Sequence, residues 1–178
     1  MKGMVPTLET FEQLREKGFR PQVVSCFVHE GKLLFMYDSK WKLWQLPQGG
    51  IEQGETAYEA LSREIEEELG EVFHKTLAIS EDTVTFLGEA KVEFPKKTQG
   101  DRLLVTKDGR EIHMKGKKYF FYAIPVAGTE VEITDTEFQK YAWLTKEDAL
   151  RRTQSIYQKG KKRITEQIIG LLSKEGFL

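Results

Sequence analysis

Apolar residues follow two different spacings along the chain, and these spacings separate predicted strands from predicted helices. Two short runs rich in branched and aromatic side chains, 22–28 (QVVSCFV) and 32–37 (KLLFMY), flank His29-Glu30-Gly31. This arrangement predicts a β-hairpin. Residues 41–46 (WKLWQL) predict a third strand, which ends at Pro47 and the glycines that follow it.

A helix is predicted over residues 57–69. Thr56 is suited to cap its amino terminus, and Glu59 stands three positions later, as in a capping box. Gly70 follows the last helical position, where glycine commonly ends a helix.

The second half of the chain returns to strands and then closes with helices. Strands are predicted over 84–94, 118–126 and 138–144, a hairpin around Asp108-Gly109, one helix after the cap Thr145, and a last helix over 161–174. Strands and helices interleave without regular βαβ spacing. We therefore expect an α+β fold, with a mixed β-sheet between α-helices.

Composition narrows the class of protein. The 178 residues fit a single domain over 1–178, with about residues 1–15 as a flexible or appended segment. A net charge of -1 gives no general attraction to nucleic acid, and no DNA-specific binding is expected. Cys26, the only cysteine, lies in an apolar run and is expected to be a packed core thiol. The first residues lack the apolar stretch of a secretory signal, and no apolar run is long enough to span a membrane, so we expect a cytoplasmic protein.

Residues 63–70 (REIEEELG) concentrate glutamates in two helical turns. At roughly 100° per residue, Glu64, Glu67 and Glu68 share one arc that borders the apolar face. Glu59 and Glu66 point toward solvent on the same projection. Like charges at these spacings repel, and partial burial raises the cost unless protons or a cation compensate. Helix geometry alone leaves two interpretations open: a solvated acidic face, or a hard-ligand site for Mg²⁺ or Mn²⁺.

The flanking sequence favours the metal site. Residues 49–70 (GGIEQGETAYEALSREIEEELG) closely resemble the Nudix box, and only Glu71 departs from it, at the position of its last aliphatic residue. The resemblance implies a Nudix fold and water attack on a diphosphate bond in a nucleoside diphosphate derivative, with Mg²⁺ as cofactor and Mn²⁺ as a substitute. It implies that Arg63 and Glu55 brace the loop. The residues implied as catalytic are Glu64, Glu67, Glu68 and Arg63, and those implied at the metal are Gly49, Glu64, Glu67 and Glu68. Glu137 joins both sets through the narrower resemblance of residues 137–144 that follows.

A narrower resemblance concerns the substrate. Residues 44–51 (WQLPQGGI), 116–124 (GKKYFFYAI) and 137–144 (EFQKYAWL) resemble segments of bacterial RNA pyrophosphohydrolases and diadenosine polyphosphate hydrolases. This resemblance implies a nucleotide or RNA 5′-end substrate. The residues expected to bind it are Arg20, Gln48, Lys117, Lys118 and Tyr119. A small-nucleotide hydrolase acting on dNTPs or ADP-ribose, and a non-catalytic nucleotide-binding module, stay open as alternatives, although the intact glutamate set argues against the second.

The region 91–118 is unusually basic, with nine Lys and Arg against four Asp and Glu. Such a patch is suited to phosphates of RNA, but it is equally typical of a solvated hairpin, and both interpretations stay open. Trp41, Trp44 and Trp143 are expected to serve in packing rather than in base stacking.

Overall fold

A mixed seven-stranded sheet forms the centre of the computed structural model, which describes residues 3–131, 133 and 136–178. Its main path runs β3 (Leu43–Gln45), β2 (Lys32–Asp38), β1 (Phe19–His29), β8 (Gly116–Pro125) and β5 (Thr85–Glu93). Two further strands, β4 (Gln48–Gly50) and β9 (Phe138–Leu144), pair with β1 and β2. β1 and β8 are parallel, and the other pairs are antiparallel.

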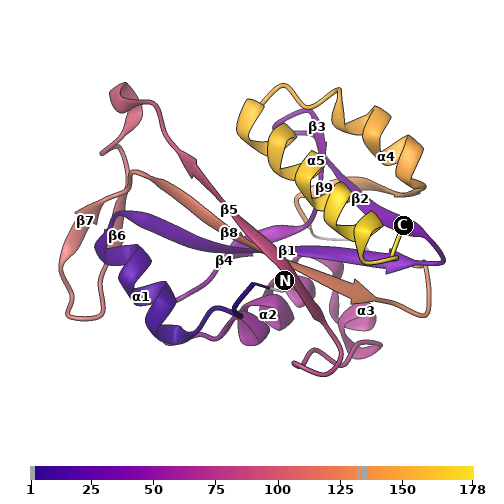
Figure 1. Cartoon of the computed structure of the whole chain (residues 1–178), viewed down its shortest axis with the longest axis horizontal. Coiled ribbons are helices and arrows are strands. Elements are labelled where there is room, and N and C mark those ends of the chain that lie inside the picture. Colours follow the sequence, from indigo (N-terminus) through magenta and orange to yellow (C-terminus); the bar gives the residue numbers. More distant parts are fainter. Residues whose placement is uncertain (1–2, 132, 134–135) are drawn as a thin grey trace.

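Helices cover both faces of this sheet (Figure 1). One face packs against α1 (Leu8–Glu16), α2 (Ala57–Leu69) and α3 (Glu71–Lys75), and the other against α4 (Lys146–Thr153) and α5 (Lys159–Lys174). The expected α+β fold with a mixed sheet between helices is confirmed.

Strand β1 runs through the middle of both hydrophobic cores. Its neighbouring residues Cys26 and Phe27 are both fully buried, and they point to opposite faces of the sheet. A strand covered on both faces reads as a continuous apolar run rather than an alternating one, as residues 23–28 do. Cys26 is a buried free thiol, as expected, and burial raises its pKa.

The predicted helix over 57–69 is confirmed at both ends. Thr56 Oγ1 accepts from the Glu59 amide, and Glu59 Oε2 accepts from the Thr56 amide, which completes the capping box. The hairpin of β1 and β2, the later strands and the two closing helices also form.

The region between residues 38 and 50 differs from the sequence prediction. Trp41 and Lys42 lie in a turn instead of a strand, because the buried Asp38 carboxylate accepts the amides of Lys40 and Trp41. After Pro47 the chain does not leave the sheet. Strand β4 pairs with β1, where Gly49 lies opposite Val23.

The amino-terminal segment, expected as flexible or appended, contains helix α1. Its Phe11 is buried in the core and makes an edge-on contact with Phe120. Helix α3 was not predicted either. Over the described part of the chain, none of the helices is both long and apolar enough to cross a membrane.

The basic region 91–118 extends beyond the sheet as a separate two-stranded hairpin of β6 (Leu103–Val105) and β7 (Glu111–His113), preceded by a 3₁₀ turn at Lys96–Thr98 (Figure 1). The Lys115 amide donates to the Gly18 carbonyl at 2.7 Å. Gln53, in the loop before α2, donates to the Val105 carbonyl. The hairpin is thus tied near its base to Gly18, which precedes β1, and near its turn to the loop that leads into the glutamate helix.

Candidate active site

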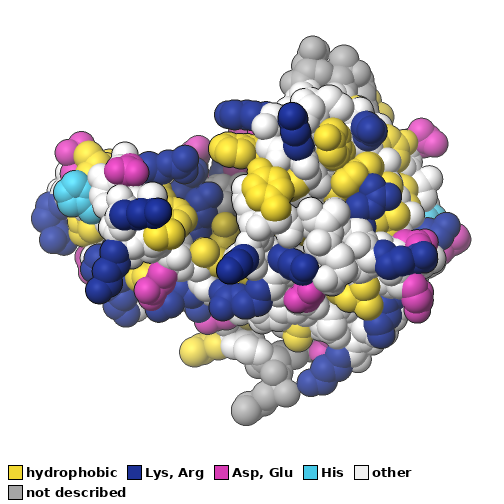
Figure 2. Space-filling view, turned by 90° about the horizontal axis from the view of Figure 1, so that it is seen from above, with side chains coloured by type: hydrophobic (Ala, Val, Ile, Leu, Met, Phe, Trp, Pro, Cys, Tyr) yellow, Lys and Arg dark blue, Asp and Glu magenta, His cyan; other side chains and the backbone are white. Residues whose placement is uncertain are grey.

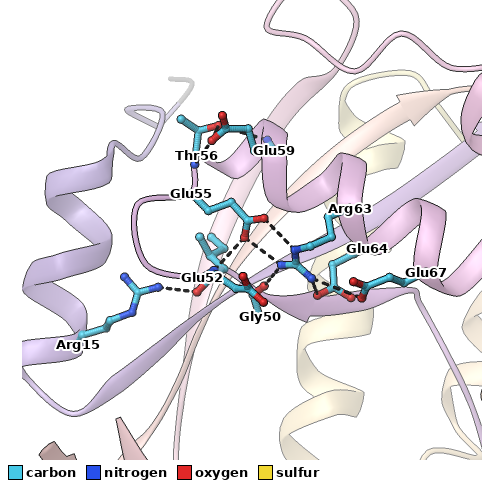
Figure 3. Close-up of polar contacts among 10 residues, drawn as sticks. Arg15, Gly50, Glu52, Glu55, Thr56, Glu59, Arg63, Glu64 and Glu67 are labelled. Atoms are coloured by element: carbon cyan, nitrogen blue, oxygen red, sulfur yellow. Dashed lines mark hydrogen bonds and ion pairs between the residues drawn. The ribbon is translucent and has the colours of Figure 1, made fainter. Parts of the chain in front are cut away.

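Arg63 fixes the loop after β4 against helix α2 (Figure 3). Its Nε and Nη2 donate to both carboxylate oxygens of Glu55, at 2.8 and 2.9 Å, and Nη2 also donates to the Gly50 carbonyl at 2.8 Å. These bonds raise the pKa of Arg63. Burial would raise the pKa of Glu55, but its bonds to Arg63 hold it below the ordinary value. A bidentate Arg–carboxylate pair gives both strength and fixed orientation.

Arg15 holds the same loop from helix α1. This buried side chain donates to the Ile51 carbonyl through Nη2 and to Glu12 through Nη1 (Figure 3 shows the first contact). Burial lowers the pKa of Arg15, and the nearby Arg20 lowers it further, while Glu12 acts in the opposite direction. The loop backbone is therefore fixed at two successive carbonyls, one by each arginine.

Gly49 lets the Glu64 side chain approach the loop backbone. A Cβ at position 49 would lie 1.8 Å from Cδ of Glu64 and 2.1 and 2.2 Å from its two carboxylate oxygens. Real Cβ atoms do not make contacts this short. The Glu64 carboxylate therefore occupies space that only a glycine leaves free.

Glu64 and Glu68 are electrostatically strained carboxylates. Burial raises the pKa of both, Glu67 raises both further, and for Glu68 the carboxylates of Glu64 and Glu137 add to the effect. The bond from Arg63 Nη1 to Glu64, at 2.6 Å, opposes the shift of Glu64. Oε2 of Glu68 is buried and has no hydrogen-bond partner among the described residues.

Glu67 differs from its expected position. Its side chain is 59% exposed, and its only contact in the described set is with Arg63 at 3.5 Å. The reason is its angle: it lies about 160° round the helix from the centre of the apolar arc, whereas Glu68 lies about 60° away. Glu59 and Glu66 are exposed, as expected.

The described carboxylates do not converge closely enough for any three of them to hold a metal ion as they stand. The donor set nevertheless fits a hard divalent cation. A buried carboxylate oxygen lacks a partner, neighbouring carboxylates repel it, and all the donors are oxygens, which Mg²⁺ and Mn²⁺ prefer. The Arg63 guanidinium pairs with the carboxylates of both Glu64 and Glu67 in this arrangement. These carboxylates therefore have to rotate away from Arg63 before they can bind a metal ion.

A cleft of about 360 Å³ opens beside Glu64. Twelve of the described residues line it: Arg20, Gln22, Asp38, Trp41, Gln45, Gln48, Gly49, Gly50, Glu64, Lys117, Glu137 and Lys161. They come from β1, β2, β3, β4, α2, β8 and α5 and from the segments before β3 and β9. Six of the residues expected from the sequence meet here: Gly49, Glu64, Glu137, Arg20, Gln48 and Lys117.

Cations line the side of the cleft formed by β1, β8 and α5. Arg20 and Lys117 are register partners in the parallel strands, so their side chains leave the same face of the sheet. Burial, together with the nearby charges of Arg20, Lys161 and Arg102, lowers the pKa of Lys117 to about 8. Lys161 Nζ donates to Gln45 Oε1 at 2.6 Å, which places α5 over the cleft. Crowded, partly buried cations favour a polyanionic ligand.

Two residues expected to bind substrate lie elsewhere. Lys118 follows Lys117 in the strand, points to the opposite face and pairs with Glu89 at 2.7 Å. Tyr119 is buried in the core beneath α5, and this burial raises its pKa to about 12. Sequence reasoning missed Asp38, Gln45 and Lys161 in the cleft, and it assigned Trp41 to packing. Only the basic run at the start of α5 hinted at Lys161.

A comparison with family models decides the class of the protein. The model described as NUDIX domain matches residues 19–167, which include the cleft and the whole of α2. The chain belongs to the Nudix family. It is a Nudix pyrophosphohydrolase, a family that typically uses a divalent metal.

Relatives within the Nudix family agree with this assignment. The chain is 30% identical over 146 residues to Nudix hydrolase 25 of Arabidopsis thaliana, covering 76% of this chain and 77% of that protein. It is 26% identical over 171 residues to an RNA pyrophosphohydrolase of a Nitratiruptor species, covering 92% and 99%. A structure titled as a possible asymmetric diadenosine tetraphosphate hydrolase from Jonesia denitrificans superposes with a TM-score of 0.63 at 18% identity, over 90% of this chain and 98% of that one. This last similarity supports the Nudix fold.

Proposed function

We propose that the protein removes pyrophosphate from 5′-triphosphate ends of RNA, cleaves dinucleoside polyphosphates, or does both. The observation that supports this most is that carboxylates and cations line the same cleft. Glu64, Glu137 and Asp38 line it together with Arg20, Lys117 and Lys161. A polyphosphate chain with its metal is the ligand class that uses both kinds of group. The RNA pyrophosphohydrolase relative supports the choice of an RNA end.

The residues proposed to hold Mg²⁺, or Mn²⁺ in its place, are Gly49, Glu64, Glu67, Glu68 and Glu137. Gly49 has only its backbone to offer. A bound divalent metal neutralises phosphate charge and supplies an activated water.

The remaining steps fall to this chain's own groups. Arg20, Lys117 and Lys161 hold the phosphates, and Arg63 with Glu55 keeps the loop fixed while the reaction proceeds. The water oxygen attacks a phosphorus atom, the anhydride bond breaks, and the bridging oxygen leaves with the departing phosphate group. Glu68 Oε2, with its raised pKa, and Glu137 are the groups suited to accept the proton that the water loses.

A substrate panel tests this proposal. We would compare kcat/KM with Mg²⁺ for 5′-triphosphate RNA, diadenosine tetraphosphate, ADP-ribose and dNTPs, and identify the products. We expect one of the first two to be preferred, with pyrophosphate released from RNA. A preference for ADP-ribose or a dNTP would overturn the substrate assignment. Glu68→Gln protein prepared in parallel shows whether the activity belongs to this site.

A further inference from the structure

A second groove adjoins the catalytic cleft and is not used by the reaction described above. It measures about 370 Å³, within the range of about 300–1,000 Å³ that small-molecule sites occupy. It shares Trp41, Lys117 and Lys161 with the cleft. Its remaining lining residues are Phe94, Thr98, Asp101, Arg102, Met114 and Gln158. The groove thus lies between the base of the β6–β7 hairpin, the turn before β3 and the start of α5.

Basic side chains surround this part of the molecule. Figure 2 shows dark-blue Lys and Arg side chains on both sides of the hollow between the lobe at the left, where Figure 1 places β6 and β7, and the rest of the molecule. Among the residues that the structure describes, Asp101 contributes the only carboxylate that lines the groove. The local charge is therefore positive, although the chain as a whole has a net charge of -1.

Two groove cations, Arg102 and Lys117, differ from several other cations of the hairpin region in their lack of a carboxylate partner among the described residues. Arg110 pairs with Asp108 at 2.8 Å, and Lys118 pairs with Glu89. Within the described residues, Arg102 and Lys117 have no carboxylate within ion-pair distance. Arg102 and Lys117 therefore line the groove without a carboxylate partner among the described residues, which suits a site for an anionic ligand.

Trp41 offers an aromatic surface at the junction of the two spaces. Its side chain is exposed, with 45% of the residue accessible, yet its backbone is fixed on both sides. Its amide donates to Asp38 Oδ1 at 3.2 Å, and its carbonyl accepts from the hydroxyl of Tyr157 at 2.8 Å. An exposed indole on an ordered backbone is a platform on which a flat ring can stack at low entropic cost.

We propose that this groove is a second nucleotide subsite, in which a base stacks on Trp41 while Arg102 and Lys117 contact the adjoining phosphate. The inference rests on the proposed function, because it assumes that the reacting phosphates occupy the neighbouring cleft. Aromatic stacking combined with cations along the backbone path is how proteins bind consecutive nucleotides without reading sequence. The nucleotide belongs either to the second residue of an RNA end or to the distal nucleoside of a dinucleoside polyphosphate.

Fluorescence titration in EDTA measures binding without turnover. The ligands are the 5′-triphosphate dinucleotide pppApA, diadenosine tetraphosphate, and ATP as the one-nucleotide reference. The variants are Trp41→Ala, its conservative partner Trp41→Phe, and Arg102→Gln. Arg110→Gln is the matched control, since Arg110 lies in the same hairpin but is already paired. Thermal unfolding checks each fold.

We expect the wild-type protein to bind at least one two-nucleotide ligand more tightly than ATP. Trp41→Ala and Arg102→Gln should each reduce that advantage, the first by about 5- to 150-fold, the range for stacking one base. Trp41→Phe should keep most of it, and Arg110→Gln should match the wild type. The ligand that loses more affinity identifies the source of the nucleotide. Equal affinities for all three ligands, or no greater loss for Trp41→Ala and Arg102→Gln than for Arg110→Gln, would overturn the proposal.

The same proteins separate this proposal from the proposed reaction. If the protein does not hydrolyse RNA ends or dinucleoside polyphosphates but still shows the variant-sensitive binding, the subsite is supported and the substrate assignment is refuted. If the protein hydrolyses these substrates but shows no binding advantage, the substrate assignment is supported and the subsite is refuted.

Discussion

Replacing Gly49 by alanine tests how closely the loop and the glutamate helix depend on each other. The new Cβ would lie 1.8 Å from Cδ of Glu64, and ordinary contact begins at 3.4 Å. The carboxylate carbon, or the loop that opposes it, must therefore shift by about 1.6 Å. The displacement would move Glu64 away from its place in the cleft, and it would disturb the 2.6 Å bond from Arg63.

The expected cost falls on turnover rather than on folding. A misplacement of about 1 Å at a catalytic group costs on the order of 100-fold in rate, so kcat for Gly49→Ala should fall by about that factor. The Glu64 side chain is able to rotate, so thermal unfolding should change little. Steady-state kinetics with saturating Mg²⁺ and a 5′-triphosphate RNA or diadenosine tetraphosphate would measure the effect.

Gly128→Ala is the matched control for this experiment. No heavy atom lies within 4 Å of the Cβ it would gain, so its kinetics should equal those of the wild type. If Gly49→Ala also keeps near-wild-type turnover, the close approach of Glu64 to the loop has no role in the reaction, and our reasoning about this position is wrong.

Four further predictions concern single side chains. Glu68→Gln should lower turnover by orders of magnitude and slightly raise the melting temperature of the metal-free protein, since a repelled, unpartnered carboxylate is removed; unchanged turnover would refute its role. Glu137→Gln should lower kcat and alter the acid limb of its pH profile, whereas an identical profile would make Glu137 a surface residue. The pKa of Lys117 is about 8, so KM should rise as this lysine loses its charge above pH 8, and Lys117→Arg should abolish the rise. Arg15→Met should lower the free energy of unfolding in urea by about 1–3 kcal/mol, because the Ile51 carbonyl loses its donor, and an unchanged value would deny that contact.

Local signals in the sequence were sufficient for much of the fold. Thr56, Glu59 and Gly70 mark both ends of α2, because capping depends on residues only a few positions apart. The turn before β3 could not be predicted from residues that are close in the sequence. Whether Trp41 begins a strand depends on the buried Asp38 carboxylate, and burial of that side chain is set by the whole sheet.

Within the candidate site, too, local sequence patterns predicted some features and could not predict those that depend on long-range contacts. The spacing of Glu64, Glu67 and Glu68 placed them on one helix. Only the projection relative to the apolar face separates the half-buried Glu68, whose Oε2 is buried, from the exposed Glu67. The link between Lys161 and Gln45 joins residues 116 positions apart, and no local pattern predicts it. Strand alternation does predict that Lys117 and Lys118 face opposite sides, although it does not say which side is the cleft.

Metal binding by the glutamate helix is the central claim of this account, and Mn²⁺ titration followed by electron paramagnetic resonance tests it most directly. The free-ion signal should decrease when Mn²⁺ is added to the wild-type protein, because the ion binds among Glu64, Glu67 and Glu68. Glu68→Gln protein should leave most of the Mn²⁺ free at the same concentrations. Equal binding by both proteins, or no binding by the wild type with or without a polyphosphate ligand, would contradict the assignment of this helix as the metal site.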